Sequence, residues 1–174
     1  MSKRNLALAS GLFAVTAALD WSTKVLSEER LGDGSVVTVV QGWAWLKLAY
    51  NRGVAFSFLE GVPHWLLGAG AIVLLGVVVW SLRPLARSAV GAAALGMVVA
   101  GGLCNAIDRL HDGQVTDMIA VWKWPVFNVA DSAITVGVAM LLLASRREKA
   151  PATAQPSAEM GLRRSDEDPP AIGP

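Results

Sequence analysis

Residues 61–82, with the sequence GVPHWLLGAGAIVLLGVVVWSL, contain no Asp, Glu, Lys or Arg. A helix needs about 20 predominantly apolar residues to cross the hydrocarbon core of a bilayer, and this stretch is long enough. Residues 63–82 therefore predict a transmembrane helix. The whole composition agrees, because 53% of the 174 residues are apolar and only 17% are charged, whereas a soluble domain has about 25% charged residues.

Three further stretches on either side have the same character. Residues 5–19 and 88–107 lack charged side chains, and residues 126–145 contain a single ionisable residue, Asp131. The sequence therefore predicts an all-α membrane protein. Its four transmembrane helices are expected at residues 5–24, 63–82, 88–107 and 126–145.

The first apolar stretch has an alternative interpretation as a cleaved signal peptide. Lys3 and Arg4 precede its apolar core, and the small residues Ala17 and Ala18 follow it, as in secretory signals. We favour a retained helix, because the stretch continues into a polar segment, residues 20–24, that is compatible with a helix.

The long connection at residues 25–62 is expected to hold a small extracytoplasmic β element. Residues 35–40 (SVVTVV) and 43–50 (WAWLKLAY) are two β-type runs separated by Gln41-Gly42. Residues 150–174 hold five of the eight prolines and many charged residues, which predicts a disordered cytoplasmic tail. Residues 1–149 are then the folded transmembrane domain.

Basic residues predict the orientation of the chain. Lys3, Arg4, Arg83, Arg87 and the basic residues at 146–149 flank one set of helix ends. Because Lys and Arg are enriched in cytoplasmic loops, we expect both termini to be cytoplasmic. Six of the seven tryptophans then fall near the outer boundary: Trp21, Trp43, Trp45, Trp65, Trp122 and Trp124.

Polar residues gather at the outer ends of the predicted helices. These residues are Asp20 and Lys24 on the first helix, Gly101, Asn105, Asp108 and Arg109 on or just after the third, and Asn128 and Asp131 on the fourth. Several are spaced three or four positions apart, so they share helix faces. Because charged groups in a membrane are costly, this one-sided cluster predicts a functional site near the outer surface.

Two carboxylates in this region suggest a chemistry. Asp117, expected in a short outer loop after the third helix, and Asp131 would lie close together in a water-poor setting. Neighbouring acids cannot easily both ionise there, and such a pair can serve as general acid and general base through one water. An aspartic protease and a small proton-coupled transporter using the same acids both remain open, and a non-enzymatic scaffold is a weaker third interpretation.

Other chemistries lack their sequence patterns. His64, His111 and the single Cys104 do not have the spacing of a metal site, and Gly-x-Ser-x-Gly and His-Glu-x-x-His are absent. The net charge of +1 gives no indication of nucleic-acid binding. We therefore expect no cofactor and no metal.

Four blocks of sequence carry a family resemblance. In order, they are DWSTK at 20–24, NRGVAF at 51–56, NAIDR at 105–109 with GQVTD at 113–117, and FNVAD at 127–131. Together they resemble bacterial lipoprotein signal peptidase (signal peptidase II), a family of aspartic proteases of the cytoplasmic membrane. The resemblance covers residues 5–145 and omits only the tail.

The resemblance implies an activity and roles for individual residues. It implies an endopeptidase that removes signal peptides from diacylglyceryl-modified prolipoproteins, cutting before the lipidated cysteine. It implies that Asp117 and Asp131 form the catalytic dyad. Matching positions suggest supporting or substrate-binding roles for Asp20, Lys24, Asn51, Asn105, Arg109 and Asn128, to which we add Gly101 and Asp108 on the helix that carries Asn105.

The resemblance also implies partners and a location. The expected partners are a lipid-modified prolipoprotein and membrane lipids, without nucleic acid, and we expect a monomer. The expected location is the bacterial inner membrane, in a multi-pass arrangement with the active site on the extracytoplasmic side. One departure is Cys104, where the family usually has Gly, although the thiol is small enough to preserve helix packing.

Overall fold

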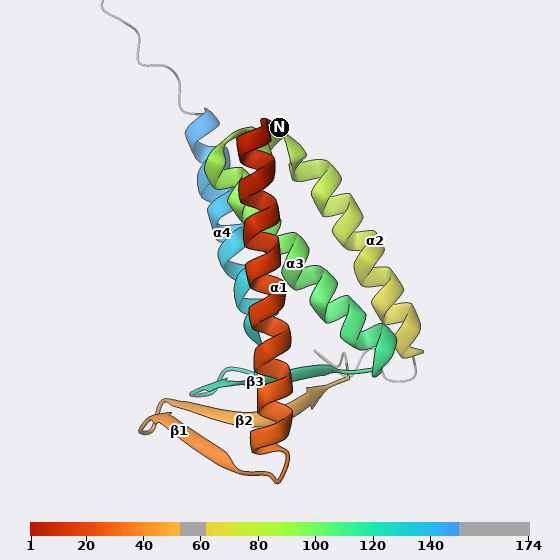
Figure 1. Ribbon diagram of the computed structural model, residues 1–174, viewed down its shortest axis with the longest axis vertical. Helices are drawn as coiled ribbons and strands as arrows, with labels where there is room; N and C mark the ends of the chain where they lie inside the picture. The colour runs from red at the N-terminus through yellow and green to blue at the C-terminus, as the bar shows by residue number, and fades with distance from the viewer. Residues whose placement is uncertain (53–61, 150–174) are drawn as a thin grey trace, which may run out of the picture.

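The structure, a computed structural model, describes residues 1–52 and 62–149 of the chain. The elements are α1 (Lys3–Leu31), β1 (Val36–Val40), β2 (Ala44–Asn51), α2 (His64–Leu82), the short 3-10 helix η1 (Arg83–Arg87), α3 (Ala89–His111), β3 (Val115–Val121) and α4 (Val129–Lys149). The helices run along the long axis, and the sheet crosses one end of them (Figure 1). The fold is therefore mostly helical, as predicted. Residues 53–56 of the second motif and the predicted tail lie outside the described residues.

The described helices cover the four predicted apolar stretches. Three of them, in the segments Lys3–Leu31, Trp65–Arg87 and Ala89–His111, are long and apolar enough to cross a membrane, and the apolar part of α4, Val129–Ser145, is shorter. The first helix also continues seven residues past its predicted end at Lys24. This extension of α1 reaches the sheet and contacts β2 and β3.

Helix α3 is the central element and packs against α1, α2 and α4. Its glycines make this possible, because a Cβ atom added at Gly96 would overlap the backbone oxygen of Ala9, and one at Gly101 would overlap that of Ala130. Small residues let helix backbones approach closely where lipid offers no hydrophobic drive for association. Two helices are thereby held tightly against α3.

The sheet is antiparallel, with strand order β1-β2-β3. Strands β1 and β2 confirm the two predicted β-type runs. The third strand was not predicted, because we expected residue 117 in a loop. Strand β3 is buried along most of its length, so it lacks the period-two alternation that marks a half-buried strand in a sequence.

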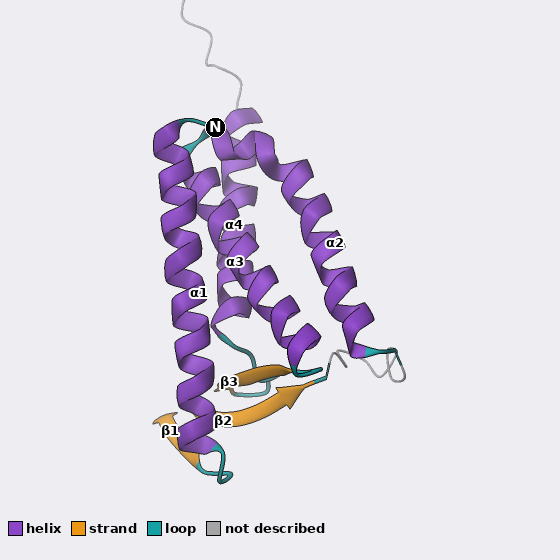
Figure 2. Cartoon of the chain, turned by 45° about the vertical axis from the view of Figure 1, so that its right-hand side comes forward, coloured by secondary structure: helices purple, strands orange, loops and turns teal. Residues whose placement is uncertain are grey.

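The third strand fixes the place of Asp117. In the register of β2 with β3, Ala49 is paired with Asp117 and Tyr50 with Thr116. The sheet lies at the end of the bundle where α3 finishes and α4 begins (Figure 2). Asp117 is thus brought from an extended strand to the start of α4.

Candidate active site

Asn128 and Asp131 form the N-terminal cap of α4. The Asn128 Oδ1 atom accepts a hydrogen bond from the backbone N–H of Asp131 at 2.8 Å, and the backbone N–H of Asn128 donates to Asp131 Oδ2 at 3.4 Å. This reciprocal pair resembles a capping box, which satisfies N–H groups that a helix start leaves free. The three-residue spacing in FNVAD therefore fixes the Asp131 carboxylate at the first turn of the helix.

Asp117 approaches the same cap from the sheet. Its side chain is almost fully buried, with 2% of the residue exposed, and its Oδ1 accepts a hydrogen bond from Asn128 Nδ2 at 2.8 Å. The side chain of Asn51, the last residue of β2, also hydrogen bonds to Asp117. One amide, that of Asn128, thus contacts both aspartates.

Asn105 on α3 completes the bridge between the two acids. Its Nδ2 donates to Asp131 Oδ1 at 2.7 Å, and its Oδ1 accepts from Asn128 Nδ2 at 3.0 Å. The structure therefore brings together Asp117, Asp131, Asn105, Asn128 and Asn51, five of the residues singled out in the sequence.

A buried cation lies behind this cluster. Lys24 Nζ is 2.6 Å from Asp20 Oδ2 and 2.6 Å from Asp108 Oδ2, and it donates to Asn105 Oδ1 at 3.4 Å. An ammonium group can only donate hydrogen bonds. Lys24 therefore holds the Asn105 oxygen toward itself, which leaves the Asn105 NH₂ group to face Asp131.

Asp20 connects the ion pair to α4. Its Oδ1 accepts the backbone N–H of Ala130 at 2.8 Å, another N–H group at the helix start. Helix α1 thus anchors the first turn of α4 through a buried carboxylate. The four-residue spacing of Asp20 and Lys24 places both groups on the face of α1 that reaches the cluster.

The surroundings of Asp117 disfavour its negative charge. Burial raises the pKa of Asp117 from 3.8 to about 6, and the charge of Asp131 adds to this rise, while hydrogen bonds from Asn51 and Asn128 act in the opposite direction. An acid with a pKa near neutrality can both hold and release a proton under physiological conditions. The arrangement can therefore support general acid and base chemistry.

Gly101 and Arg109 have supporting positions. Gly101 lies against the backbone of Ala130, as described above. Arg109 donates from Nη1 to the backbone oxygen of Asn105 at 3.2 Å. Within the part of the chain that the structure describes, Arg109 hydrogen bonds to the end of α3 and is not joined to either aspartate.

Two contacts near the site were missed in the sequence. Thr116, next to Asp117, donates from its hydroxyl to Glu28 Oε1 on α1 at 2.8 Å, and its backbone oxygen faces Asn128 Nδ2 at 3.4 Å. The position of Glu28 could have been predicted, because the polar, helix-forming residues that follow Lys24 extend α1 to Glu28. No local pattern indicated its partner on β3.

The chain is similar to a known family of proteins. A model of the Signal peptidase (SPase) II family matches residues 12–147. The lipoprotein signal peptidase of Geobacter sulfurreducens is 41% identical over 145 residues, covering 76% of this chain and 89% of the relative. That of Methylorubrum extorquens is 38% identical over 169 residues, covering 88% and 94%.

The fold is also similar to solved structures. A bacterial membrane enzyme solved at 2.3 Å resolution has a TM-score of 0.67 and 22% sequence identity, covering 84% of this chain and 94% of that one. At this identity the likeness concerns the fold alone. Because the family model covers most of the folded part and the relatives match over most of their length, this chain belongs to the signal peptidase II family.

Proposed function

We propose that this protein is a membrane-embedded aspartic endopeptidase that removes signal peptides from diacylglyceryl-modified prolipoproteins, cutting just before the lipidated cysteine. The family implies a protease that processes lipoproteins. The observation that carries the aspartic mechanism is the bridge of Asn128 and Asn105 between Asp117 and Asp131. It holds two carboxyl groups in one small, partly buried space.

The two acids have different surroundings, which suggests different roles. Asp131 is partly exposed and lines a surface pocket, so a water molecule and a substrate can reach it. We assign it as the general base that takes a proton from the attacking water. Asp117 is buried with a pKa of about 6, and we assign it as the acid that donates a proton to the scissile carbonyl oxygen.

These roles form a balanced hydrolysis. The water oxygen attacks the carbonyl carbon while Asp131 accepts a water proton and Asp117 protonates the carbonyl oxygen. The tetrahedral intermediate then collapses, the C–N bond breaks, and the leaving amine takes a proton from Asp131 as the carbonyl returns its proton to Asp117. Because Asp117 must begin protonated, we expect kcat/KM to fall as pH rises above about 6.

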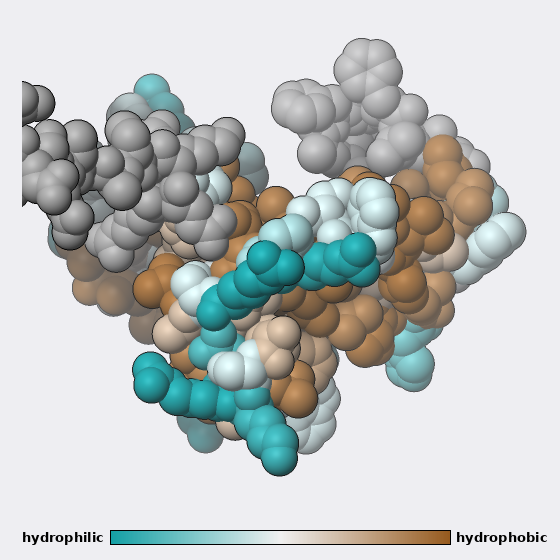
Figure 3. Space-filling view, turned by 90° about the horizontal axis from the view of Figure 1, so that it is seen from above, coloured by the Kyte–Doolittle hydropathy of each residue, from teal (hydrophilic) through white to brown (hydrophobic). Residues whose placement is uncertain are grey.

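We further propose that four helices span the bacterial inner membrane, with both termini in the cytoplasm and the sheet outside. The family and the apolar helices fit a multi-pass protein of that membrane. Figure 3 views the end of the bundle where α1 begins and shows hydrophilic side chains over it, with hydrophobic surface beside them. The aspartates lie at the opposite end, which suits a substrate whose lipid is in the outer leaflet.

The direct test is cleavage by the purified protein in detergent. We expect it to release the signal peptide from a lipidated prolipoprotein and to leave the unlipidated precursor intact. Asp117→Asn and Asp131→Asn should each abolish cleavage. Asp112→Asn is the matched control, because Asp112 is an exposed acid that pairs with neighbouring His111, and it should cleave normally. Substantial residual cleavage by either dyad variant would refute the aspartic mechanism.

A proton-coupled transporter is the competing function. Such a carrier needs ionisable groups along its path through the membrane. Within residues 1–52 and 65–145, the buried charged residues are Asp20, Lys24 and Asp117, and their contacts place them at the same end of the bundle. This distribution favours the peptidase.

A further inference from the structure

The turn between β3 and α4 presents aromatic side chains at the edge of the candidate site. We call residues 122–127, WKWPVF, the aromatic turn. Its backbone is held at three points: Trp122 N–H donates to Trp43 O at 2.7 Å, Trp124 N–H to Val121 O at 2.8 Å, and Phe127 exchanges two hydrogen bonds with Ile119 at 2.8 and 3.0 Å. The aromatic turn is therefore fixed to the sheet.

Its two tryptophans are nevertheless exposed. Trp124 is 71% exposed and Trp122 60% exposed, and the neighbouring Trp43 is 59% exposed. The rings of Trp43 and Trp122 stack with centroids 5.8 Å apart. Trp122 has a φ of 43°, a conformation that is unfavourable for a bulky residue. Strained residues persist where the surrounding structure fixes them, and they often occur at ligand sites.

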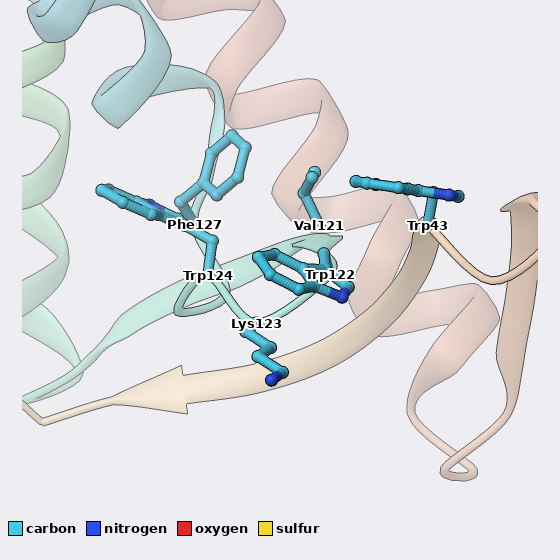
Figure 4. A pocket seen from close by; sticks show the side chains of 6 residues that line it. All are labelled: Trp43, Val121, Trp122, Lys123, Trp124 and Phe127. Carbon is cyan, nitrogen blue, oxygen red and sulfur yellow. The ribbon is translucent and has the colours of Figure 1, made fainter.

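Two pockets meet at this turn. One, of about 460 Å³, is lined by Trp43, Val121, Trp122, Lys123, Trp124 and Phe127 (Figure 4). The other, of about 360 Å³, is lined by Trp124, Phe127, Asp131, Ser132, Thr135 and Val136. Because Trp124 and Phe127 line both, we treat them as one feature, the aromatic groove. Each pocket is within the roughly 300–1,000 Å³ typical of ligand sites.

The groove offers an occupant mainly carbon surface. The hydroxyls of Ser132 and Thr135 donate to carbonyls of their own helix, Asn128 O at 3.0 Å and Asp131 O at 2.8 Å. The Lys123 ammonium lies over the Trp122 ring, 5.0 Å from its centroid. An extended peptide here would find few partners for its N–H and C=O groups, which is costly near lipid. A hydrocarbon chain has no such groups.

We propose that the aromatic groove binds an acyl chain of the substrate's diacylglyceryl group. This inference rests on the proposed function, which requires the lipidated cysteine to lie beside the bond that is cut. Asp131 lines the groove together with the apolar side chains of Trp124, Phe127 and Val136. A chain seated there would hold the lipidated cysteine next to Asp131, so the groove positions the scissile bond.

The test compares two substrates that differ only in acyl length. Both are the same prolipoprotein peptide with its signal segment, carrying either dipalmitoyl or dihexanoyl glyceryl on the cysteine. Val136→Trp should fill the groove and lower kcat/KM for the dipalmitoyl substrate at least about tenfold, since displacement of a positioned substrate is costly. Cleavage of the dihexanoyl substrate should change less than about twofold, because a short chain does not reach as far along the groove.

Matched variants separate this effect from a general loss of structure. Val138→Trp adds the same ring to the same helix at another exposed valine outside both pockets, and it should leave both substrates unaffected. Trp124→Ala should widen the groove and reduce the preference for the longer chain. Equal losses for both substrates in Val136→Trp, or unchanged kinetics in both Val136→Trp and Trp124→Ala, would overturn the acyl site. Failure of the wild-type protein to cleave either substrate would refute the proposed function and the acyl site together.

Discussion

Asp117 carries its carboxyl group on a buried strand, whereas Asp131 carries its own at the first turn of a helix. The strand position withholds water from Asp117 and places it near a second acid, and both effects raise its pKa. The helix start supplies N–H groups and the positive end of the helix dipole to Asp131. Two chemically identical side chains are thereby made unequal, as acid and base roles require.

Because the pKa of Asp117 is raised in the folded protein, we expect ionisation of this side chain to lower the stability of the wild-type fold. The folded state holds the proton more tightly than the unfolded state, so stability falls as pH rises from about 4 to about 6. Asp117→Asn removes the charge but keeps an oxygen for Asn128. We expect this variant to be more stable than wild type above pH 6, by roughly 1–3 kcal/mol.

Thermal unfolding in detergent at several pH values tests this expectation. The advantage of Asp117→Asn should shrink as pH falls from 6 toward 4 and be lost below that, where the wild-type carboxyl is protonated in both states. Asp112→Asn, at an exposed acid, is the control and should not be stabilised at pH 8. A variant that is less stable than wild type at pH 8 would contradict the linkage.

Lys24 predicts a different kind of loss. Lys24→Met would leave Asp20 and Asp108 without their shared cation, and Asp20 is almost fully buried. Removing one partner of a buried ion pair costs about 3–5 kcal/mol, which a lowered unfolding temperature would report. Lys3→Met, at an exposed lysine, is the control. Unchanged stability in Lys24→Met would mean that the ion pairs contribute little.

Residue chemistry predicted that polar side chains gather at one end of the helices, and the family resemblance implied the roles of Asp117 and Asp131. The hydrogen bonds that connect these side chains could not be predicted. Asp117, Asp131 and the asparagines can be recognised as candidate site residues, because polar groups near lipid are costly and usually have a function. The orientation of the side-chain amides of Asn105 and Asn128 depends on Lys24 and on the cap of α4. Lys24 and this cap are far apart in the sequence. The hydrogen bond of Arg109 is an example of a contact that could not be predicted. It goes to the backbone of its own helix, and residue spacing does not indicate this partner.

At the scale of elements, hydropathy located the helices well and the sheet only in part. The hairpin of β1 and β2 is local, and its two runs of β-type residues flank the break at Gln41-Gly42. Strand β3 is buried along most of its length and contacts β2, α1 and α3, so its sequence resembles an apolar loop segment. In the sequence, α2 and α3 lie between β2 and β3. Local periodicity contains no information about pairing between strands that are so far apart in the chain.

The close approach of α3 and α4 yields a prediction about Gly101. An alanine there would overlap the backbone oxygen of Ala130 and push the first turn of α4, with Asp131, away from Asn105. We expect Gly101→Ala to lower stability by about 1–3 kcal/mol and kcat/KM by about 100-fold. Cleavage assays and thermal unfolding measure both.

Gly76 on α2 provides the matched control. A Cβ atom at Gly76 would meet no other atom within 4 Å, and alanine is the better helix former by roughly 0.5–1 kcal/mol. Gly76→Ala should therefore be as stable as wild type or slightly more so, with normal cleavage. If Gly101→Ala behaved in the same way, tight α3–α4 packing would not be what positions Asp131.

The whole molecule is polarised along its helices. Asn5 donates from Nδ2 to the backbone oxygens of Ala86 and Arg87 at 3.3 and 2.6 Å, which ties the start of α1 to the turn between α2 and α3. Lys3, Arg4, Arg83 and Arg87 therefore lie at one end, and the sheet and aspartates at the other. From the distribution of basic residues, we propose that the first end faces the cytoplasm.

This polarity predicts which sites a reagent can reach from outside the cell. In a Cys104→Ser background, Ser35→Cys places a thiol beside the sheet, and Ser2→Cys places one at the cap of α1; both positions are exposed. A membrane-impermeant maleimide added to intact spheroplasts should label position 35 and not position 2, and both should react after lysis. The Cys104→Ser parent should remain unlabelled throughout. The reverse pattern would place the aspartates on the cytoplasmic side, where the lipid of an exported prolipoprotein could not reach them.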